Sequence, residues 1–151
     1  MAGRLRCRWA RLPVWARWVL VAYVTGFVEG TADHLRWMLH GGIHAYAGAY
    51  PQVAIQALFV SLIVLDPLAA LLTGHVRREG VWLACAIMVP DMIANWAGNW
   101  TRITTTQGDL LDTAPWLITA FGVFVLATAV PLLRVIGHRA TPGPTSTSQA
   151  A

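Results

Sequence analysis

The sequence predicts an all-α membrane protein, a bundle of four transmembrane helices. Of its 151 residues, 56% are hydrophobic and only 12% are charged, whereas soluble domains carry about 25% charged residues. The apolar residues gather into four segments, each close to the ~20 residues that a helix needs to cross the hydrocarbon core. The mean hydropathy of +0.54 excludes an ordinary soluble domain and, away from the ends, a disordered chain.

The predicted spans form one membrane domain over residues 1–140. Each span must be helical, because lipid offers no partner to free backbone groups. The first span follows a basic N-terminus, but it is long, contains Glu29 and lacks a clear cleavage site, so we expect a retained span and no signal peptide. Residues 141–151 have the composition of a disordered tail. The four spans cover residues 13–33, 52–73, 80–100 and 114–136.

The links between the spans differ in length. The outer link 34–51, between the first and second spans, is the longest, and we expect it to begin as a helical extension that breaks at its glycines. Residues 74–79 form a tight turn, which makes the second and third spans antiparallel neighbours. The link 101–113 is polar, and Asp112 or Thr113 can cap the fourth helix.

Arginine placement predicts the orientation of the bundle. The chain has 11 Arg and no Lys. Two of them, Arg36 and Arg102, lie at one end of the bundle, and the other nine lie at the end that holds both termini. The positive-inside rule then places both termini in the cytoplasm and the protein in the cell membrane. The nine are Arg4, Arg6, Arg8, Arg11, Arg17, Arg77, Arg78, Arg134 and Arg139.

Tryptophans support the same topology. Six of the eight lie near the ends of the predicted spans, where an interfacial aromatic belt requires them. These are Trp15, Trp18, Trp37, Trp82, Trp100 and Trp116. Because the arginines follow the membrane topology, the sequence pI of about 9.8 does not indicate nucleic acid as a partner.

Polar residues within the spans are the candidate functional residues, because an ionisable group at the centre of a span costs roughly 2.5–3.5 kcal/mol on insertion scales. Glu29, Asp66 and Asp91 are the candidate catalytic acids. No Arg, Lys or His lies well inside a span to neutralise them, so we expect protonated carboxyls or a cationic ligand. The candidate ligand-binding residues are Asp33, Gln56, Asn95, Trp96, Asn99, His40 and His44.

Helical spacing groups several of these residues. Asp91, Asn95 and Asn99 repeat every four residues and share one face of the third span. Glu29 lies at a similar depth in the first span, and Asp66 lies slightly nearer the cytoplasm. We therefore expect one polar cavity that opens outward, with Asp66 at its floor. Asp91 should be the most sensitive carboxyl, because it lies near the midplane after a proline that can widen the bundle.

The outer link contains a second group of candidates. His40 and His44 are four residues apart, a spacing that suits a metal pair on a helix, although Gly41 and Gly42 lie between them. We expect an interfacial polar and aromatic loop here. Metal or haem ligation, a catalytic histidine over the cavity mouth and a carboxylate–histidine site around His34 are the alternatives. No metal and no cofactor is predicted.

In its topology the chain resembles the EXPERA family, which includes sterol isomerases and the sigma-2 receptor. The matching features are acids at the end of the first span (Glu29, Asp33), Asp66 beside a proline in the second, and the tight turn after it. The resemblance implies a membrane cavity whose acidic residues bind a cationic amine or carbocation. The diagnostic His and Glu residues of the family have no counterparts that can be placed residue by residue. The chain also looks like small integral membrane proteins of actinobacteria, a likeness that implies no function.

Three functions fit these features. The first is a receptor or acid–base enzyme, of the isomerase or cyclase type, for a hydrophobic small molecule such as an isoprenoid, with Trp96 adding a cation–π contact. The second is a homo-oligomer that conducts protons or cations. The third is a non-catalytic assembly subunit, in which polar residues only join the helices at about 0.6 kcal/mol per hydrogen bond. The expected partners are the lipid bilayer, the hydrophobic ligand and further copies of the chain.

Overall fold

The computed structural model describes residues 2–48, 50, 52–105 and 113–137. Within these residues the regular elements are all α-helices, which confirms the all-α fold class. The expected tail and the cap residue Asp112 lie outside the described residues. The helices are α1 (Ala2–Ala10), α2 (Val14–Ala47), α3 (Val53–Gly74), α4 (Arg78–Thr105) and α5 (Thr113–Gly137).

Three helical segments are long and apolar enough to cross a membrane, which indicates a membrane protein. They correspond to the second, third and fourth predicted spans, and they are Val53–Gly74, Arg78–Trp100 and Pro115–Gly137. Helix α2, which holds the predicted first span, does not meet the same measure among the described residues. Arg17 and Glu29 interrupt its apolar sequence and lower its hydropathy.

The backbone geometry at the start of α2 suits proline, and the geometry at its break suits glycine. Pro13 precedes its first turn with a φ of −61°, a position that suits proline because no intrahelical bond is lost there. The helix continues past the predicted first span to Ala47, with one non-helical residue, Gly42, at a φ of 75° and a ψ of 168°. Such a φ favours glycine. The expected helical extension with a break at the glycines is therefore confirmed.

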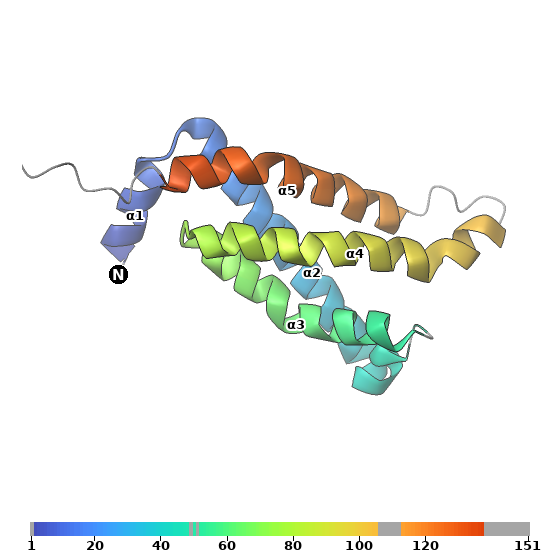
Figure 1. Ribbon diagram of the computed structural model, residues 1–151. Coiled ribbons are helices and arrows are strands. Elements are labelled where there is room, and N and C mark those ends of the chain that lie inside the picture. Colours follow the sequence, from blue (N-terminus) through green and yellow to red (C-terminus); the bar gives the residue numbers. More distant parts are fainter. Residues whose placement is uncertain (1, 49, 51, 106–112, 138–151) are drawn as a thin grey trace, which may run out of the picture.

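The helices pack in chain order, α2 on α3, α3 on α4 and α4 on α5, and α2 also meets α5. Figure 1 shows α4 returning alongside α3 after a tight turn, as expected. The core residue Tyr23 joins α2 to α5, because its hydroxyl donates to the Val125 carbonyl at 2.7 Å. One turn further along, the Phe27 ring meets the Phe121 ring edge to face at 5.5 Å between centroids.

We expect Gly80→Ala to destabilise the turn between α3 and α4. A Cβ at this position would lie 2.6 Å from the Thr73 backbone nitrogen and 2.7 Å from the Leu72 carbonyl carbon. Because these are backbone atoms, the turn must shift, at a cost of about 1–3 kcal/mol. Thermal unfolding in detergent measures this loss. Gly3→Ala is the control, since no atom lies within 4 Å of its Cβ; equal melting temperatures for the two variants would contradict the expectation.

Candidate functional site

Polar side chains from three helices meet in one place, which we call the His–Asp cluster. It consists of His34 and Tyr46 from α2, Asp66 from α3, and Asp91 and Asn95 from α4. His34 Nε2 lies 3.5 Å from Asp66 Oδ2, and His34 Nδ1 lies 2.6 Å from the Tyr46 hydroxyl. Asp91 is close enough to both Asp66 and His34 for their charges to act on its carboxyl. The cluster therefore brings two carboxyl groups and one imidazole together.

Gly30 gives Asp66 room to lie against α2. A Cβ at Gly30 would lie 2.7 Å from Asp66 Oδ2, so only the bare backbone of a glycine leaves space for this carboxyl. Asp66 is 4% exposed, and its side chain is shut between the two helices. His34 lies one turn after Gly30, on the same face of α2. The sequence spacing on α2 thus places the imidazole directly beside the buried carboxyl.

The Tyr46 hydroxyl determines which nitrogen of His34 carries a proton. It lies 2.6 Å from His34 Nδ1 and 3.0 Å from the Phe59 carbonyl oxygen. A phenol has one proton to donate, and a carbonyl can only accept. Both bonds form when Tyr46 donates to Phe59 and His34 Nδ1–H donates to the Tyr46 oxygen. His34 Nε2 then faces Asp66 as the exchangeable position.

Tyr46 lies in the outer part of α2, beyond the predicted first span. Burial raises the pKa of its phenol above the ordinary value, and the acidic groups of Tyr50, Asp66, Asp91 and Asp33 raise that pKa further. The phenol therefore keeps its proton at neutral pH. Tyr46 remains a donor to the Phe59 carbonyl, which preserves the hydrogen-bond arrangement around the imidazole.

A hydrogen bond between His34 Nε2 and Asp66 Oδ2, which lie 3.5 Å apart, requires a proton on one of these two atoms. If Asp66 is ionised, His34 Nε2 must carry a proton, because a bare nitrogen facing a carboxylate would set lone pair against lone pair. If His34 Nε2 is bare, Asp66 must be the protonated partner. Asp91 provides a second carboxyl, whose Oδ1 accepts a bond from Asn95 Nδ2 at 3.0 Å. An imidazole and a carboxyl that face each other beside a second carboxyl can move a proton or hold a cation.

Aromatic rings cover the imidazole. The ring centroids of Tyr46 and Phe59 lie 6.0 Å and 6.2 Å from that of His34, and Tyr50 packs on Phe59 at 5.0 Å. The His34 side chain is 16% exposed and the Asp66 side chain 6% exposed. His34 is thus the member of the pair that an approaching molecule meets first.

Three of the predicted site residues belong to the cluster, namely Asp66, Asp91 and Asn95. Asn95 is 7% exposed, and Asp91 is half-buried. Glu29 does not belong to it, because its side chain is exposed. Asp33 is also exposed and pairs with Arg36 at 3.2 Å.

The remaining predicted residues lie outside the cluster. Gln56 donates to the Tyr50 carbonyl. Trp96 Nε1 donates to Thr119 Oγ1 on α5 at 2.8 Å, and Asn99 Nδ2 donates to a carbonyl one turn earlier on α4 at 2.8 Å.

His40 and His44 are both exposed on the extension of α2. His40 Nδ1 lies 2.7 Å from the Arg36 carbonyl oxygen, one turn earlier, so this ring nitrogen is occupied by the helix backbone. Within the described part of the chain, no three His, Cys, Asp or Glu residues are grouped so that they could hold a metal ion.

The sequence predicted His34 only as part of an alternative carboxylate–histidine site, and it did not predict Tyr46 as a site residue. A usable pattern exists in α2, where Tyr23, Phe27, Gly30 and His34 follow one another at intervals of four, three and four. Tyr23 and Phe27 are buried, so this stripe faces the bundle and carries His34 inward. The pattern predicts the orientation of His34 only when the helix is extended beyond residue 33.

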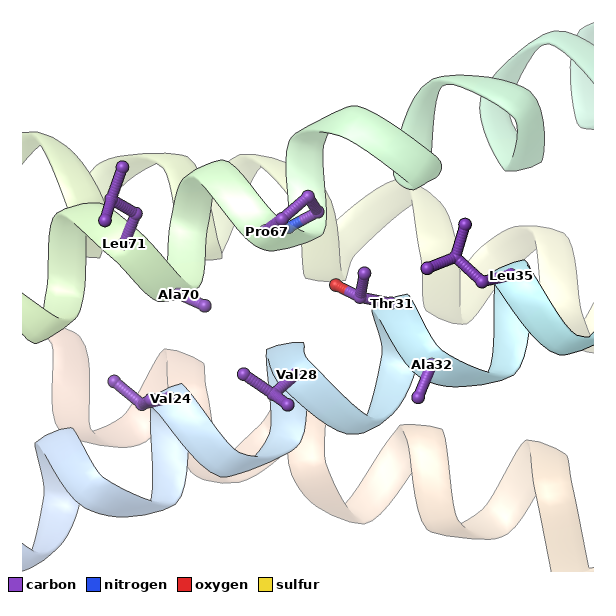
Figure 2. A pocket seen from close by; sticks show the side chains of 8 residues that line it. All are labelled: Val24, Val28, Thr31, Ala32, Leu35, Pro67, Ala70 and Leu71. Atoms are coloured by element: carbon purple, nitrogen blue, oxygen red, sulfur yellow. The ribbon is translucent and has the colours of Figure 1, made fainter.

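A separate apolar groove of about 480 Å³ lies between α2 and α3. Figure 2 shows the side chains of the two helices that line it. The groove contains none of the predicted site residues, and the hydroxyl of its polar member Thr31 donates to the Phe27 carbonyl at 2.7 Å. The lining residues are Val24, Val28, Thr31, Ala32, Leu35, Pro67, Ala70 and Leu71.

The fold and site define a class of protein: an all-helical chain with three helices apolar enough for a membrane and a buried histidine–carboxylate cluster. Comparison with protein-family models, curated proteins and solved structures finds no match for the chain. The resemblance to the EXPERA family therefore stays a prediction from topology.

We expect Tyr46→Phe to change the tautomer of His34. Loss of the hydroxyl leaves His34 Nδ1 without this partner, at a cost of about 1–3 kcal/mol. Nitrogen-15 NMR of labelled histidine should report a protonated Nδ1 in the parent protein and a mixture in the variant. Tyr23→Phe is the matched control, because it also removes a buried hydroxyl but does not touch His34. Identical His34 spectra for the parent and Tyr46→Phe would contradict the assignment.

Proposed function

We propose that the chain is a four-span membrane protein, with α2 as the first span and both termini in the cytoplasm. The packing of α2 supports this topology, because α2 lies along α3, which is itself apolar enough to span a membrane. The stripe that contains Tyr23 and Phe27 faces the bundle. A helix packed along a span shares its depth, and the charged residues Arg17 and Glu29 lie near opposite ends of the predicted span 13–33.

We further propose that the protein binds a hydrophobic small molecule, such as an isoprenoid, whose polar or reacting group meets the His–Asp cluster. The observation that carries this proposal is the approach of His34 Nε2 to within 3.5 Å of the buried Asp66 Oδ2. Packing alone needs hydrogen bonds, but it does not need an acid–base pair with a second carboxyl, Asp91, beside it. The apolar groove, lined in part by Pro67, adjoins the same helix pair and offers a place for an apolar tail.

Such a pair suits isomerase-type chemistry. His34 or Asp66 would donate a proton to one carbon of a double bond, which leaves a carbocation on the other carbon. The Asp91 carboxylate would stabilise this cation. Loss of a proton from a neighbouring carbon to the same pair would move the double bond and restore the starting protonation. The topology-level resemblance to the EXPERA family implies the same type of cationic species.

A second candidate is a purely structural role in helix packing. Complete hydrogen bonding favours this role, because among the described residues no buried side-chain nitrogen or oxygen lacks a partner. A polar seam that only joins helices requires this completeness. The two candidates differ in whether the seam also holds a ligand.

We expect Asp66→Asn and His34→Gln to lose at least tenfold of the ligand that the parent protein retains in mild detergent. Each variant removes one partner of the contact between His34 and Asp66. Native mass spectrometry measures the retained mass, and thermal unfolding is recorded in parallel. Asp91→Asn belongs in the series, because Asp91 was predicted to be the most sensitive carboxyl. Glu29→Gln is the matched control, since it also replaces a carboxyl by an amide but at an exposed position of α2.

The outcomes of this series separate the two candidates. Loss of ligand with unchanged melting temperature supports a binding site. If Asp66→Asn and His34→Gln retain as much bound mass as Glu29→Gln but melt several degrees lower, the cluster is structural.

Reporter insertions test the topology. With four spans, a periplasmic phosphatase inserted after Gly48 should be active and one fused after Gly137 should be inactive, because the two sites face opposite sides of the membrane. If α2 does not span the membrane, Gly48 lies on the same side as the N-terminus and opposite to Gly137. A fusion at the N-terminus then distinguishes the two cases, since matching signals at the N-terminus and Gly48 would exclude α2 as a span.

A further inference from the structure

Helix α1 packs against the end of the bundle that is opposite the link between α2 and α3. Figure 1 shows α1, the turn between α3 and α4, and the C-terminal end of α5 at this same end. The Arg8 guanidinium donates to the His75 carbonyl at 2.9 Å, and Trp9 Nε1 donates to the Gly74 carbonyl at 2.9 Å. These carbonyls belong to the end of α3, where the helix leaves acceptors unpaired. Helix α1 is therefore held in a defined position.

The corner between α1 and α2 is also closed by hydrogen bonds. The Arg17 guanidinium donates to the Ala10 carbonyl at 2.7 Å and to the Leu12 carbonyl at 3.0 Å. Leu12 is 3% exposed and joins the core, and Trp9 packs against that core. Trp9 thus faces the bundle, while Arg6 and Arg8 are exposed, Arg8 with one bond to the His75 carbonyl.

Exposed arginines from three parts of the chain surround this end, and we call them the basic surface. It consists of Arg6, Arg8, Arg11, Arg77, Arg78 and Arg134. The turn and the end of α5 adjoin, because a Cβ at Gly137 would lie 3.4 Å from Arg78 Cζ. Among the described residues at this end the one acid is Glu79, which pairs with Arg77 at 3.3 Å. The surface therefore carries a strong excess of positive charge.

Exposed tryptophans locate this surface relative to a bilayer. Trp15 and Trp18 at the start of α2 and Trp82 at the start of α4 are all exposed. Exposed tryptophans at the ends of membrane helices lie at the level of the lipid headgroups. The arginines of α1 precede Trp15 in the chain and those of the turn precede Trp82, so both groups lie on the side of these tryptophans away from the apolar segments.

We propose that the basic surface binds the headgroup phosphates of anionic phospholipids, with α1 lying along the headgroup layer as a fixed arm. A guanidinium presents paired N–H donors that match two phosphate oxygens. Attraction of basic juxtamembrane residues to anionic lipid adds to this recognition. The proposal rests on the membrane position proposed above for this end, and it is independent of the ligand at the His–Asp cluster.

The test compares two lipids that differ in charge. The full chain, stripped of lipid in detergent, is mixed with phosphatidylglycerol or phosphatidylcholine of the same acyl chains. Native mass spectrometry counts the bound lipids, and thermal unfolding reports stabilisation. We expect at least fivefold more phosphatidylglycerol than phosphatidylcholine to be retained, a higher melting temperature with phosphatidylglycerol alone, and loss of this preference in high salt.

Paired variants assign the preference to the basic surface. Arg6→Gln should lower phosphatidylglycerol retention about threefold, and Arg6→Gln with Arg78→Gln about tenfold. Arg36→Gln is the matched control, because it removes one exposed arginine at the opposite end of the bundle. Asp66→Asn should keep full phosphatidylglycerol retention, which separates this proposal from the proposed ligand site. Equal retention of the two lipids, or a loss with Arg36→Gln as large as with Arg6→Gln, would overturn the proposal. Saturable binding of a short RNA without a phosphatidylglycerol preference would overturn it as well.

Discussion

The candidate site depends on the close approach of α2 and α3 at Gly30. The Asp66 carboxyl lies where the side chain of any other residue at position 30 would be, so the helix backbone itself forms one wall around a buried acid. That contact brings Asp66 beside His34, and the outer extension of α2 adds Tyr46, whose hydroxyl orients the imidazole. A larger residue at position 30 would displace the Asp66 carboxyl and separate the acid from its base.

The fold was predictable because its determinants are local. Runs of about 20 apolar residues require helices in lipid, and glycine readily adopts the positive φ at which α2 breaks, at Gly42. The site was only partly predictable. Asp66, Asp91 and Asn95 stand out because polar groups are rare in apolar runs. His34 and Tyr46 do not, since their meeting depends on how far α2 continues and how it is rotated against α3, and neither is encoded by spacing within one helix.

Helix α2 combines two environments on one element. One face carries Tyr23, Phe27, Gly30 and His34 into the bundle, while Glu29 lies exposed on another face. Helix α3 also supplies a site residue, Asp66, and remains apolar enough to span a membrane. The weaker hydropathy of α2 comes from Arg17 and Glu29, which lie outside the cluster.

The net charge of the His–Asp cluster favours one kind of bound molecule. With Asp66 and Asp91 ionised and His34 protonated, the cluster carries a net charge of about −1. A net charge among buried, apolar helices is costly unless it is compensated. Arg36, the arginine on the adjoining turn of α2, is exposed and already pairs with Asp33, so it does not supply the missing charge. Either a second proton or a cationic group on a bound molecule completes the balance, and a ligand that is or becomes positively charged satisfies both carboxyl groups at once.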